Sequence, residues 1–377
     1  MKHSNPFVAG PMLQNPQLFV GREEELRAII TRMRGSQPTS LNIVGERQIG
    51  KSSLLYYFFL TWQQRISQPE KYVVIYLSLK NANCQKEKNF YQAIAQKLLN
   101  CPSVKKESKL IGLLQKKTLN RLAFTQAIEE FKQQSLLPVL CLDDFDSLFD
   151  HRNEHQKEFD NGFYDNLRAL MDDSALMLVL TTCKELDVYG KEYHFVSSFF
   201  NVGHVIKLGE FTKDEAKYLT NLSVNSIEET PALTEEEQKL AQKWGRCHPY
   251  LLQLAAYYLW EARQNGRDFK WAEKEFKSQL NKDKYKLNGH SRPKISWLLI
   301  ITLIIIIIGI ISVMIIMPQS ILMIFNSFGA IGQTLDTIEN LSHIIIGLLI
   351  LVIVILSATR LLPEVKEFLL HLLKKFS

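Results

Sequence analysis

Residues 45–52 read Gly45-Glu46-Arg47-Gln48-Ile49-Gly50-Lys51-Ser52 and match the pattern G-x-x-x-x-G-K-[ST] in full. The glycines allow backbone conformations that a side chain would obstruct, so that successive N–H groups can surround a phosphate. An apolar run precedes the loop and a helical pattern follows it, which places the loop at the positive end of a helix. The stretch predicts a phosphate-binding loop in which Lys51 reaches the β- and γ-phosphates and Ser52 ligates Mg²⁺. A glycine-containing loop without a ligand is the alternative.

A second motif lies further along the chain, where Pro138-Val139-Leu140-Cys141-Leu142 runs into Asp143-Asp144. An apolar strand that ends in carboxylates is the Walker B pattern, in which the first acid holds Mg²⁺ opposite Ser52. We therefore expect Asp143 to bind the metal and Asp144 to orient or activate the attacking water. Lys51, Asp143 and Asp144 are the catalytic candidates, and ATP and Mg²⁺ are the predicted cofactors. The Asp144 side chain is one methylene shorter than glutamate, so slow hydrolysis is expected. Solvated acids at a strand end are the alternative interpretation.

Apolar runs alternate with helical patterns around these motifs. The runs that read as buried strands are Leu41–Val44, Tyr72–Leu79, Pro138–Leu142, Leu176–Thr181 and His204–Leu208. The helical patterns between them are Arg22–Met33, Ser52–Gln64, Phe90–Leu99, Leu122–Gln134 and Phe159–Met171. Such alternation predicts an α/β fold with a parallel five-stranded sheet covered on both faces. Strand signals stop after Leu208, and residues 212–280 read as about four helices.

Composition narrows the possible partners and the compartment. The net charge of the 377 residues is +6, and no basic stripe interleaved with aromatic residues is found, so we expect no nucleic-acid partner. The five cysteines are scattered and form no C-x-x-C pair, which favours reduced thiols in the cytosol over a disulfide framework or a zinc site. The first ten residues lack an apolar segment, so no secretory signal is expected.

The last quarter of the sequence contains two long uncharged apolar stretches. Residues 295–317 carry no charge and consist mainly of Ile and Leu, and spanning a bilayer takes about 20 such residues in a helix. Residues 341–359 form a second uncharged apolar stretch. Lysines and arginines lie before the first stretch and after the second, whereas residues 318–340 between them contain neither. The positive-inside rule then places both termini in the cytosol of a cytoplasmic (inner) membrane protein with two spanning helices.

These observations give a predicted domain order. The expected segments are an ATPase core (1–210), a helical lid (211–281), a basic juxtamembrane linker (282–294), a first membrane helix (295–317), an extracytoplasmic amphipathic loop (318–340), a second membrane helix (341–359) and a basic amphipathic tail (360–377). The loop and the tail have apolar residues at three- and four-residue steps. They are expected to lie on the membrane surface, although packing between copies in an oligomer is an alternative for the loop.

Ahead of the phosphate-binding loop, Phe19-Val20-Gly21-Arg22-Glu23-Glu24-Glu25 resembles the h-h-G-R-E-x-E box of STAND NTPases and related AAA+-like ATPases. The chain thus resembles a bacterial STAND or AAA+-like P-loop ATPase of ASCE type, related to NB-ARC-like and archaeal-type ATPases, over about residues 5–280. The resemblance implies that Val20 and Gly21 pack on adenine, with Arg22 nearby. An ordinary helix start is the alternative for these residues.

Two further pieces support the resemblance. The run Leu178–Cys183 is similar to a sensor-1 strand, so Thr181 or Thr182 could approach the γ-phosphate, although related NB-ARC members carry Arg at the place of Cys183. His248-Pro249 looks like the lid element that caps the nucleotide, and simple helix capping is the alternative. The implied nucleotide-binding set is Val20, Gly21, Arg22, Gly45, Glu46, Arg47, Gln48, Ile49, Gly50, Lys51, Ser52, Ser53, Thr182, His248 and Pro249.

Two functional hypotheses follow from the sequence. In the first, the chain is a membrane-anchored ATP switch of signalling or defence, in which nucleotide drives a conformational change or homo-oligomerisation coupled to the membrane segment. STAND-like proteins usually add a repeat sensor, and no internal repeat is found here, so a partner protein or the membrane would supply the stimulus. In the second, a membrane-tethered AAA+-like ATPase cycles continuously to do mechanical or remodelling work. Its expected features are a catalytic glutamate and a clear arginine finger.

Overall fold

The computed structural model describes residues 4–81, 84–116, 119–149, 158–201, 203–223 and 230–288. Residues Met1–Tyr285 form one compact unit, and a second unit comprises Lys286–Ser377. The predicted membrane helices, the loop between them and the tail lie outside the described residues. Within the described part of the chain, no helix is both long and apolar enough to cross a membrane.

A five-stranded sheet lies at the centre of the first unit, with strand order β2-β3-β4-β1-β5. Every neighbouring pair of strands is parallel. The strands are β1 (Leu41–Val44), β2 (Tyr72–Ser78), β3 (Leu137–Asp143), β4 (Met177–Thr182) and β5 (Val205–Lys207). The predicted parallel five-stranded sheet is confirmed. Because β4 lies between β1 and β3, the phosphate-binding loop after β1 and the acidic pair at the end of β3 flank the same strand end.

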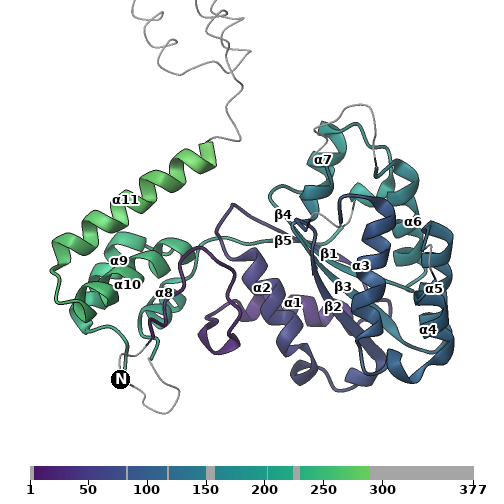
Figure 1. Ribbon diagram of the computed structural model, residues 1–377, viewed down its shortest axis with the longest axis horizontal. Coiled ribbons are helices and arrows are strands. Elements are labelled where there is room, and N and C mark those ends of the chain that lie inside the picture. The colour runs from purple at the N-terminus through teal and green to yellow at the C-terminus, as the bar shows by residue number, and fades with distance from the viewer. Residues whose placement is uncertain are drawn as a thin grey trace, which may run out of the picture. The chain divides into compact units, whose positions relative to one another are not determined.

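Helices cover both faces of this sheet (Figure 1). The helices of this part are α1 (Glu23–Met33), α2 (Lys51–Thr61), α3 (Glu87–Leu99), α4 (Ser108–Leu114), α5 (Arg121–Gln133), α6 (Asn161–Asp172) and α7 (Leu186–Glu192). Five of them match the predicted helical patterns, whereas α4 and α7 were not predicted. Helices α1 and α2 pack on one face, and α3, α5 and α6 pack on the other.

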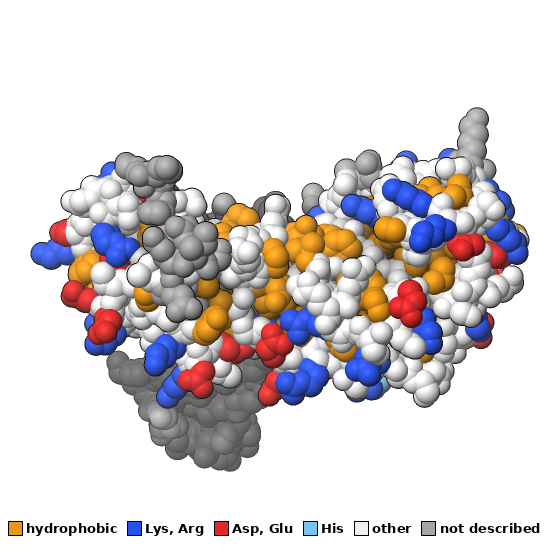
Figure 2. Space-filling model, turned by 90° about the horizontal axis from the view of Figure 1, so that it is seen from below, with side chains coloured by type: hydrophobic (Ala, Val, Ile, Leu, Met, Phe, Trp, Pro, Cys, Tyr) orange, Lys and Arg blue, Asp and Glu red, His pale blue; other side chains and the backbone are white. Residues whose placement is uncertain are grey.

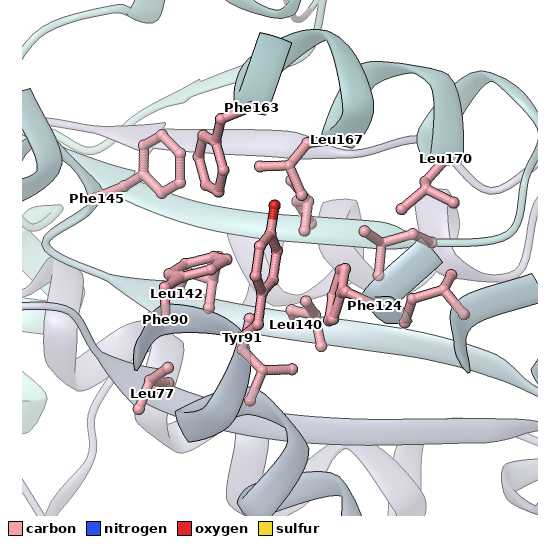
Figure 3. Close-up of a cluster of buried hydrophobic side chains, with 14 of the residues drawn as sticks. Leu77, Phe90, Tyr91, Phe124, Leu140, Leu142, Phe145, Phe163, Leu167 and Leu170 are labelled. Atoms are coloured by element: carbon pink, nitrogen blue, oxygen red, sulfur yellow. The ribbon is translucent and has the colours of Figure 1, made fainter. Parts of the chain in front are cut away.

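The two faces have separate cores because side chains alternate along each strand. On the side of α3, α5 and α6, Leu140 and Leu142 meet a cluster of aromatic rings around Tyr91 (Figure 3). On the side of α1 and α2, Val139 and Cys141 pack under the helix that follows the phosphate-binding loop. The alternation places the side chain of Asp143, two residues after Cys141, on this second face. The Walker B aspartate therefore lies on the same side of the sheet as α2.

A group of helices follows the sheet and has its own core. These helices are α8 (Lys213–Thr220), α9 (Glu235–Gly245), α10 (Pro249–Gln264) and α11 (Phe269–Asn288). Phe7 and Val20 from the N-terminal segment are buried in this core. Gly245 lets α9 and α10 approach closely, since a Cβ there would lie 2.6 Å from the Leu252 backbone. The predicted helical region is present, and α11 continues into the stretch predicted as a linker.

Candidate functional site

The phosphate-binding loop has the backbone that its sequence predicts. Gly50, with φ of 102°, lies in the left-handed region immediately before α2 begins at Lys51, where a side chain would be strained. A Cβ on Gly45 would lie 2.6 Å from the Leu208 carbonyl oxygen, so only glycine fits between β1 and the chain after β5. The Ile49 side chain is buried in the α1/α2 core. It thereby fixes the floor of the loop, while the exposed Glu46, Arg47 and Gln48 form its outer rim.

Lys51 is buried and bends over its own loop. Its Nζ donates to the carbonyl oxygens of Gly45 at 2.7 Å and Glu46 at 2.8 Å. Burial lowers the pKa of the Lys51 ammonium, and the nearby charges of Asp146, Asp144 and Asp143 partly oppose that shift. The lysine and the acidic residues of β3 therefore lie on the same side of the sheet, as a Walker site requires.

The two acids at the end of β3 are linked by one hydroxyl group. Thr181 donates to Asp143 Oδ1 at 2.6 Å and accepts from the Asp144 backbone N–H at 2.8 Å. Tyr76 donates to the other oxygen, Asp143 Oδ2, at 2.9 Å. Burial and the charge of Asp143 raise the pKa of Tyr76, so its hydroxyl remains a donor. Both oxygens of Asp143 are thus oriented by side chains from neighbouring strands.

Asp144 has a different environment from Asp143. Its backbone lies in the left-handed region, with φ of 55°, a conformation that Asp tolerates better than most residues. Burial and the charge of Asp143 raise the pKa of Asp144, while an ion pair with Lys80 at 2.8 Å opposes the rise. A carboxylate with a raised pKa is a stronger base, which suits the water-activating role predicted for Asp144.

Several residues of this edge were not predicted. The sequence-based set did not include Tyr76, Lys80 or Asp146. Tyr76 and Lys80 contact the two Walker aspartates, and the charge of Asp146 acts on Lys51. Asp146 accepts from the Cys183 backbone N–H and from the Tyr189 hydroxyl. The repeated acids after the strand could have indicated Asp146. The contribution of Tyr76 follows only from the register of β2 against β3.

The two threonines of the predicted sensor strand face different ways. The Thr181 hydroxyl contacts the acidic pair, as described above. The Thr182 hydroxyl instead donates to the Lys184 carbonyl oxygen at 2.6 Å, and its oxygen lies 3.0 Å from Asn42 Oδ1. Since neighbouring strand residues point to opposite faces, only one of them can approach Asp143. The structure places Thr181 there, whereas Thr182 projects from the opposite face of the sheet, beside Asn42 of β1.

The oxygen donors of the site suit Mg²⁺. Among the described residues, no group of three or more His, Cys, Asp or Glu side chains is arranged to hold a metal ion. Mg²⁺ commonly takes only one or two protein ligands, and phosphate oxygens and water complete its shell. Ser52, in the first turn of α2, and Asp143, already oriented by two hydroxyls, fit such a set.

Ser53, in the first turn of α2, contacts the N-terminal segment of the chain. Its Oγ accepts from the Leu13 backbone N–H at 3.1 Å. Five residues earlier in the chain, the Val8 backbone N–H donates to Gln253 of α10 at 2.9 Å. The N-terminal segment therefore runs from the helical group to the first turn of α2, and it brings backbone groups to the predicted nucleotide edge.

The h-h-G-R-E-x-E box lies where the sheet meets the helical group. Arg22 is buried and takes a left-handed backbone before α1. Its Nη2 donates to the Gly209 carbonyl at 2.6 Å, and its guanidinium lies 4.7 Å from the centre of the Phe211 ring. The same group lies 3.5 Å from the carbonyl oxygen of Ile49 in the phosphate-binding loop. Arg22 thus connects that loop with the segment leading into α8.

Glu215 completes this junction from the first turn of α8. Its Oε1 accepts from the Arg22 backbone N–H at 2.7 Å, and its Oε2 accepts from the Thr212 backbone N–H at 2.8 Å. The carboxylate touches Gly21 so closely that a Cβ at that position would collide with it. Burial alone would raise the pKa of Glu215, but the hydrogen bonds from Arg22 and Thr212 hold it below its ordinary value.

His248 and Pro249 begin α10, as their pattern indicates. Pro249 is the first helical residue and His248 is the N-cap. Burial lowers the pKa of His248, an effect that the charges of Glu210 and Glu46 partly oppose. Its Nδ1 is buried without a hydrogen-bond partner among the described residues. The charge of Glu46, on the rim of the phosphate-binding loop, therefore acts on His248.

A family model and several solved structures are similar to this chain. A family model for the AAA-like domain matches residues 7–287. A Walker-type ATPase of Pyrococcus abyssi is similar in structure, with a TM-score of 0.52 and 18% identity over 76% of this chain and 80% of that chain. The ORC2 protein of Aeropyrum pernix, in ADPNP–ADP complexes, has a TM-score of 0.47 and 13% identity over 72% of this chain and 69% of that chain. The ORC1 protein of the same organism, in complex with DNA, has a TM-score of 0.47 and 14% identity over 73% and 69%. No curated protein matches the chain.

Proposed function

The chain belongs to the AAA-like domain family and carries a P-loop ATPase-type domain, and we propose that it binds and slowly hydrolyses ATP with Mg²⁺. The observation that carries this proposal is the arrangement around Thr181. At the end of β3, the Thr181 hydroxyl donates to Asp143 and accepts from the Asp144 backbone N–H, and the charges of both aspartates act on the buried Lys51. A structural loop without a ligand has no need of a buried lysine beside three aspartates, because burying such charges costs free energy.

Each residue has a distinct role in the proposed reaction. The amides of residues 45–52 surround the phosphates, and Lys51 neutralises the charge of the β- and γ-phosphates. Ser52 and Asp143 would hold Mg²⁺, which would supply charge neutralisation at the transferred phosphoryl group. Asp144 accepts a hydrogen bond from the attacking water and takes its proton. The raised pKa of Asp144 supports this last role.

We further propose that nucleotide acts as a switch, of the STAND or AAA+-like kind used in signalling or defence. The junction of Arg22 with Glu215 supports this proposal. Arg22 reaches towards the carbonyl of Ile49 in the phosphate-binding loop, while its own amide is held by α8. In this proposal, a ligand bound in the loop changes the position of the helical group through Arg22, and the two positions are the two states that a switch requires.

The proposed location is the cytoplasmic face of a membrane. Residues 295–317 and 341–359 would anchor the chain, with both termini in the cytosol, and the support is their apolar composition with the positive charges that flank them. The ATP-bound form would assemble into a homo-oligomer, with the stimulus supplied by a partner protein or the membrane.

The absence of a nucleic-acid partner stays a prediction. On the face shown in Figure 2, lysine and arginine side chains are interspersed with aspartate and glutamate around a central band of hydrophobic side chains. The described side chains on this face do not form the single-sign basic surface that nucleic-acid binding favours.

The switch is tested with full-length protein in detergent micelles, by light scattering in ADP and in a non-hydrolysable ATP analogue. We expect a larger assembly with the analogue and no difference for Lys51→Ala. We also expect unstimulated turnover below about 1 s⁻¹, the lower end of common enzyme rates. Rapid steady turnover with an unchanged assembly would contradict the switch and support the continuously cycling ATPase. Failure of both nucleotides to bind would contradict the ATPase assignment itself.

A further inference from the structure

We propose that Tyr76 is a positioning residue for the metal-binding aspartate, and that its hydroxyl sets the affinity of the site for Mg²⁺. This inference rests on the proposed function, because it assigns a role at the same site. Neither the phosphate-binding loop nor the acidic pair includes this residue, which lies on a different strand. Its hydroxyl donates to Asp143 Oδ2 at 2.9 Å, while Thr181 donates to Oδ1 at 2.6 Å.

The register of the sheet explains why Tyr76 can reach Asp143. Strand β2 pairs with β3 so that Tyr76 lies opposite Cys141, and Ser78 lies opposite Asp143. Tyr76 and Asp143 therefore project from the same face and are diagonal neighbours on adjacent strands. The tyrosine side chain is long enough to reach across this diagonal, as its 2.9 Å hydrogen bond to Asp143 shows. The tyrosine ring spans the two-residue offset, so its hydroxyl arrives at the end of the sheet where the carboxylate lies.

The ring of Tyr76 is held in place from α2. Tyr56 packs edge-on against it, with ring centres 5.0 Å apart, and Phe59 lies at 6.0 Å. The sulfur of Met12, in the N-terminal segment, lies 3.3 Å from the Tyr76 hydroxyl oxygen. The phenolic group has one proton, and the carboxylate is a stronger acceptor than the thioether sulfur. Tyr76 therefore donates its hydrogen bond to Asp143. The surroundings thus fix the donor before any ligand binds.

The Tyr76 hydroxyl should change the affinity of the site for Mg²⁺ and leave the binding of the phosphates unchanged. A carboxylate that accepts one hydrogen bond on each oxygen is restricted in rotation, and each oxygen keeps a further lone pair for Mg²⁺ or a water bound to it. Groups that orient a metal ligand change metal affinity or activity by about 10- to 100-fold when they are removed. Lys51 and the loop amides bind the phosphates independently of this carboxylate. Loss of the Tyr76 hydroxyl should therefore weaken the effect of Mg²⁺ on nucleotide binding.

The test is a titration of full-length protein with a fluorescent ATP analogue, at a series of Mg²⁺ concentrations and in EDTA. Tyr76→Phe removes only the hydroxyl. Tyr56→Phe is the matched control, since it removes a hydroxyl from the adjoining ring of the same cluster. We expect the half-maximal Mg²⁺ concentration to rise about tenfold or more for Tyr76→Phe and to stay unchanged for Tyr56→Phe. In EDTA, both variants should bind the analogue as the unaltered protein does.

The outcomes separate the two proposals. If the unaltered protein binds the analogue without any dependence on Mg²⁺, the proposed function fails. If it shows that dependence and Tyr76→Phe matches it, the role of Tyr76 is wrong while the function stands. An equal loss of affinity in EDTA and in Mg²⁺ would mean a merely structural role and would also overturn the inference. A double variant gives a second check, because Tyr76→Phe should add nothing once Asp143 is replaced by Asn.

Discussion

Two polar clusters of this molecule are built in different ways. At the Walker edge, Lys51 and the two acids of β3 lie at the ends of parallel strands, where strand order and register bring them together. At the junction, Arg22 and Glu215 are 193 residues apart in the chain, and they meet only because the helical group packs against the start of α1. The first cluster follows from the sheet, and the second depends on tertiary packing. We therefore expect substitutions at the edge to change chemistry, and those at the junction to change coupling and stability.

The largest expected effect is that of Lys51→Ala. Charge-assisted hydrogen bonds contribute about 1.5–3 kcal/mol each, and Lys51 would contact two phosphates. We predict that ATP affinity falls roughly 100-fold or more, since about 1.4 kcal/mol corresponds to a factor of ten. Isothermal titration calorimetry provides the measurement. Lys191→Ala is the control, because that side chain is 80% exposed. An affinity equal to that of the unaltered protein would remove Lys51 from the site.

Asp144→Asn separates hydrolysis from binding within the Walker edge. The amide cannot take a proton from water, so we predict a fall in turnover of about 10²- to 10⁴-fold, the usual contribution of a general base. ATP affinity should change little, because Lys51 and the loop amides are untouched. Single-turnover phosphate release measures the rate. Full activity of the variant would exclude Asp144 as the base and leave the binding site intact.

Glu215→Gln tests the junction. The variant loses an acceptor for the Arg22 or Thr212 amide, and an unsatisfied group of this kind costs about 1–3 kcal/mol. The melting temperature should fall by about 2–4 °C for each kcal/mol, as measured by circular dichroism. Glu237→Gln is the matched control, since Glu237 occupies the same position in the capping box of α9. Both variants should lose stability, but Glu215→Gln alone should uncouple ATP binding from assembly. If the two variants assemble with ATP in the same way, the proposed coupling is contradicted.

The pH dependence of that stability has a definite sign. The pKa of Glu215 in the folded protein is below its ordinary value, so the unfolded chain binds the proton more readily. The advantage of the unaltered protein over Glu215→Gln should be full above the ordinary glutamate pKa. It should shrink as the pH falls through the lower value of the folded state. A constant difference between the two melting curves over this acidic range would contradict the assignment.

The smallest expected effect is that of Lys80→Ala. Lys80 is 69% exposed, and exposed ion pairs contribute little to stability, so the melting temperature should hardly move. Its charge nevertheless opposes the rise in the pKa of Asp144. Removing it should shift the acidic limb of the pH–rate profile to higher pH. A profile that keeps its position would show that Lys80 does not act on Asp144 during turnover.

The comparison also explains what could be predicted from sequence. The ends of the five strands were located within one residue, because each strand is a short apolar run between turns. The helices α4 and α7 were missed, since each has only seven residues and contains a glycine. In both cases the helix is stabilised by burial against the aromatic core, which local patterns do not reveal.

The site residues likewise fall into those that a contiguous motif predicts and those that depend on strand pairing or packing. The phosphate-binding loop and the acidic pair are contiguous motifs, so their residue types alone predict the chemistry. The choice of Thr181 over Thr182 depends on which strand face Asp143 occupies, and the contribution of Tyr76 depends on pairing between strands. Thr212 and Glu215 form the capping box of α8, as the spacing of the two residue types at a helix start favours. Its second use, as an acceptor for Arg22, required the packed structure.

Hydrogen–deuterium exchange with and without Mg²⁺ and a non-hydrolysable ATP analogue tests the central claim most directly, because it reports both clusters at once. We predict strong protection of the amides of residues 45–52, where the phosphates would be bound, and weaker protection around Arg22 and the first turn of α8. Protection confined to the loop would restrict the effect of nucleotide to the Walker edge. Unchanged exchange in residues 45–52 at saturating nucleotide would contradict the account.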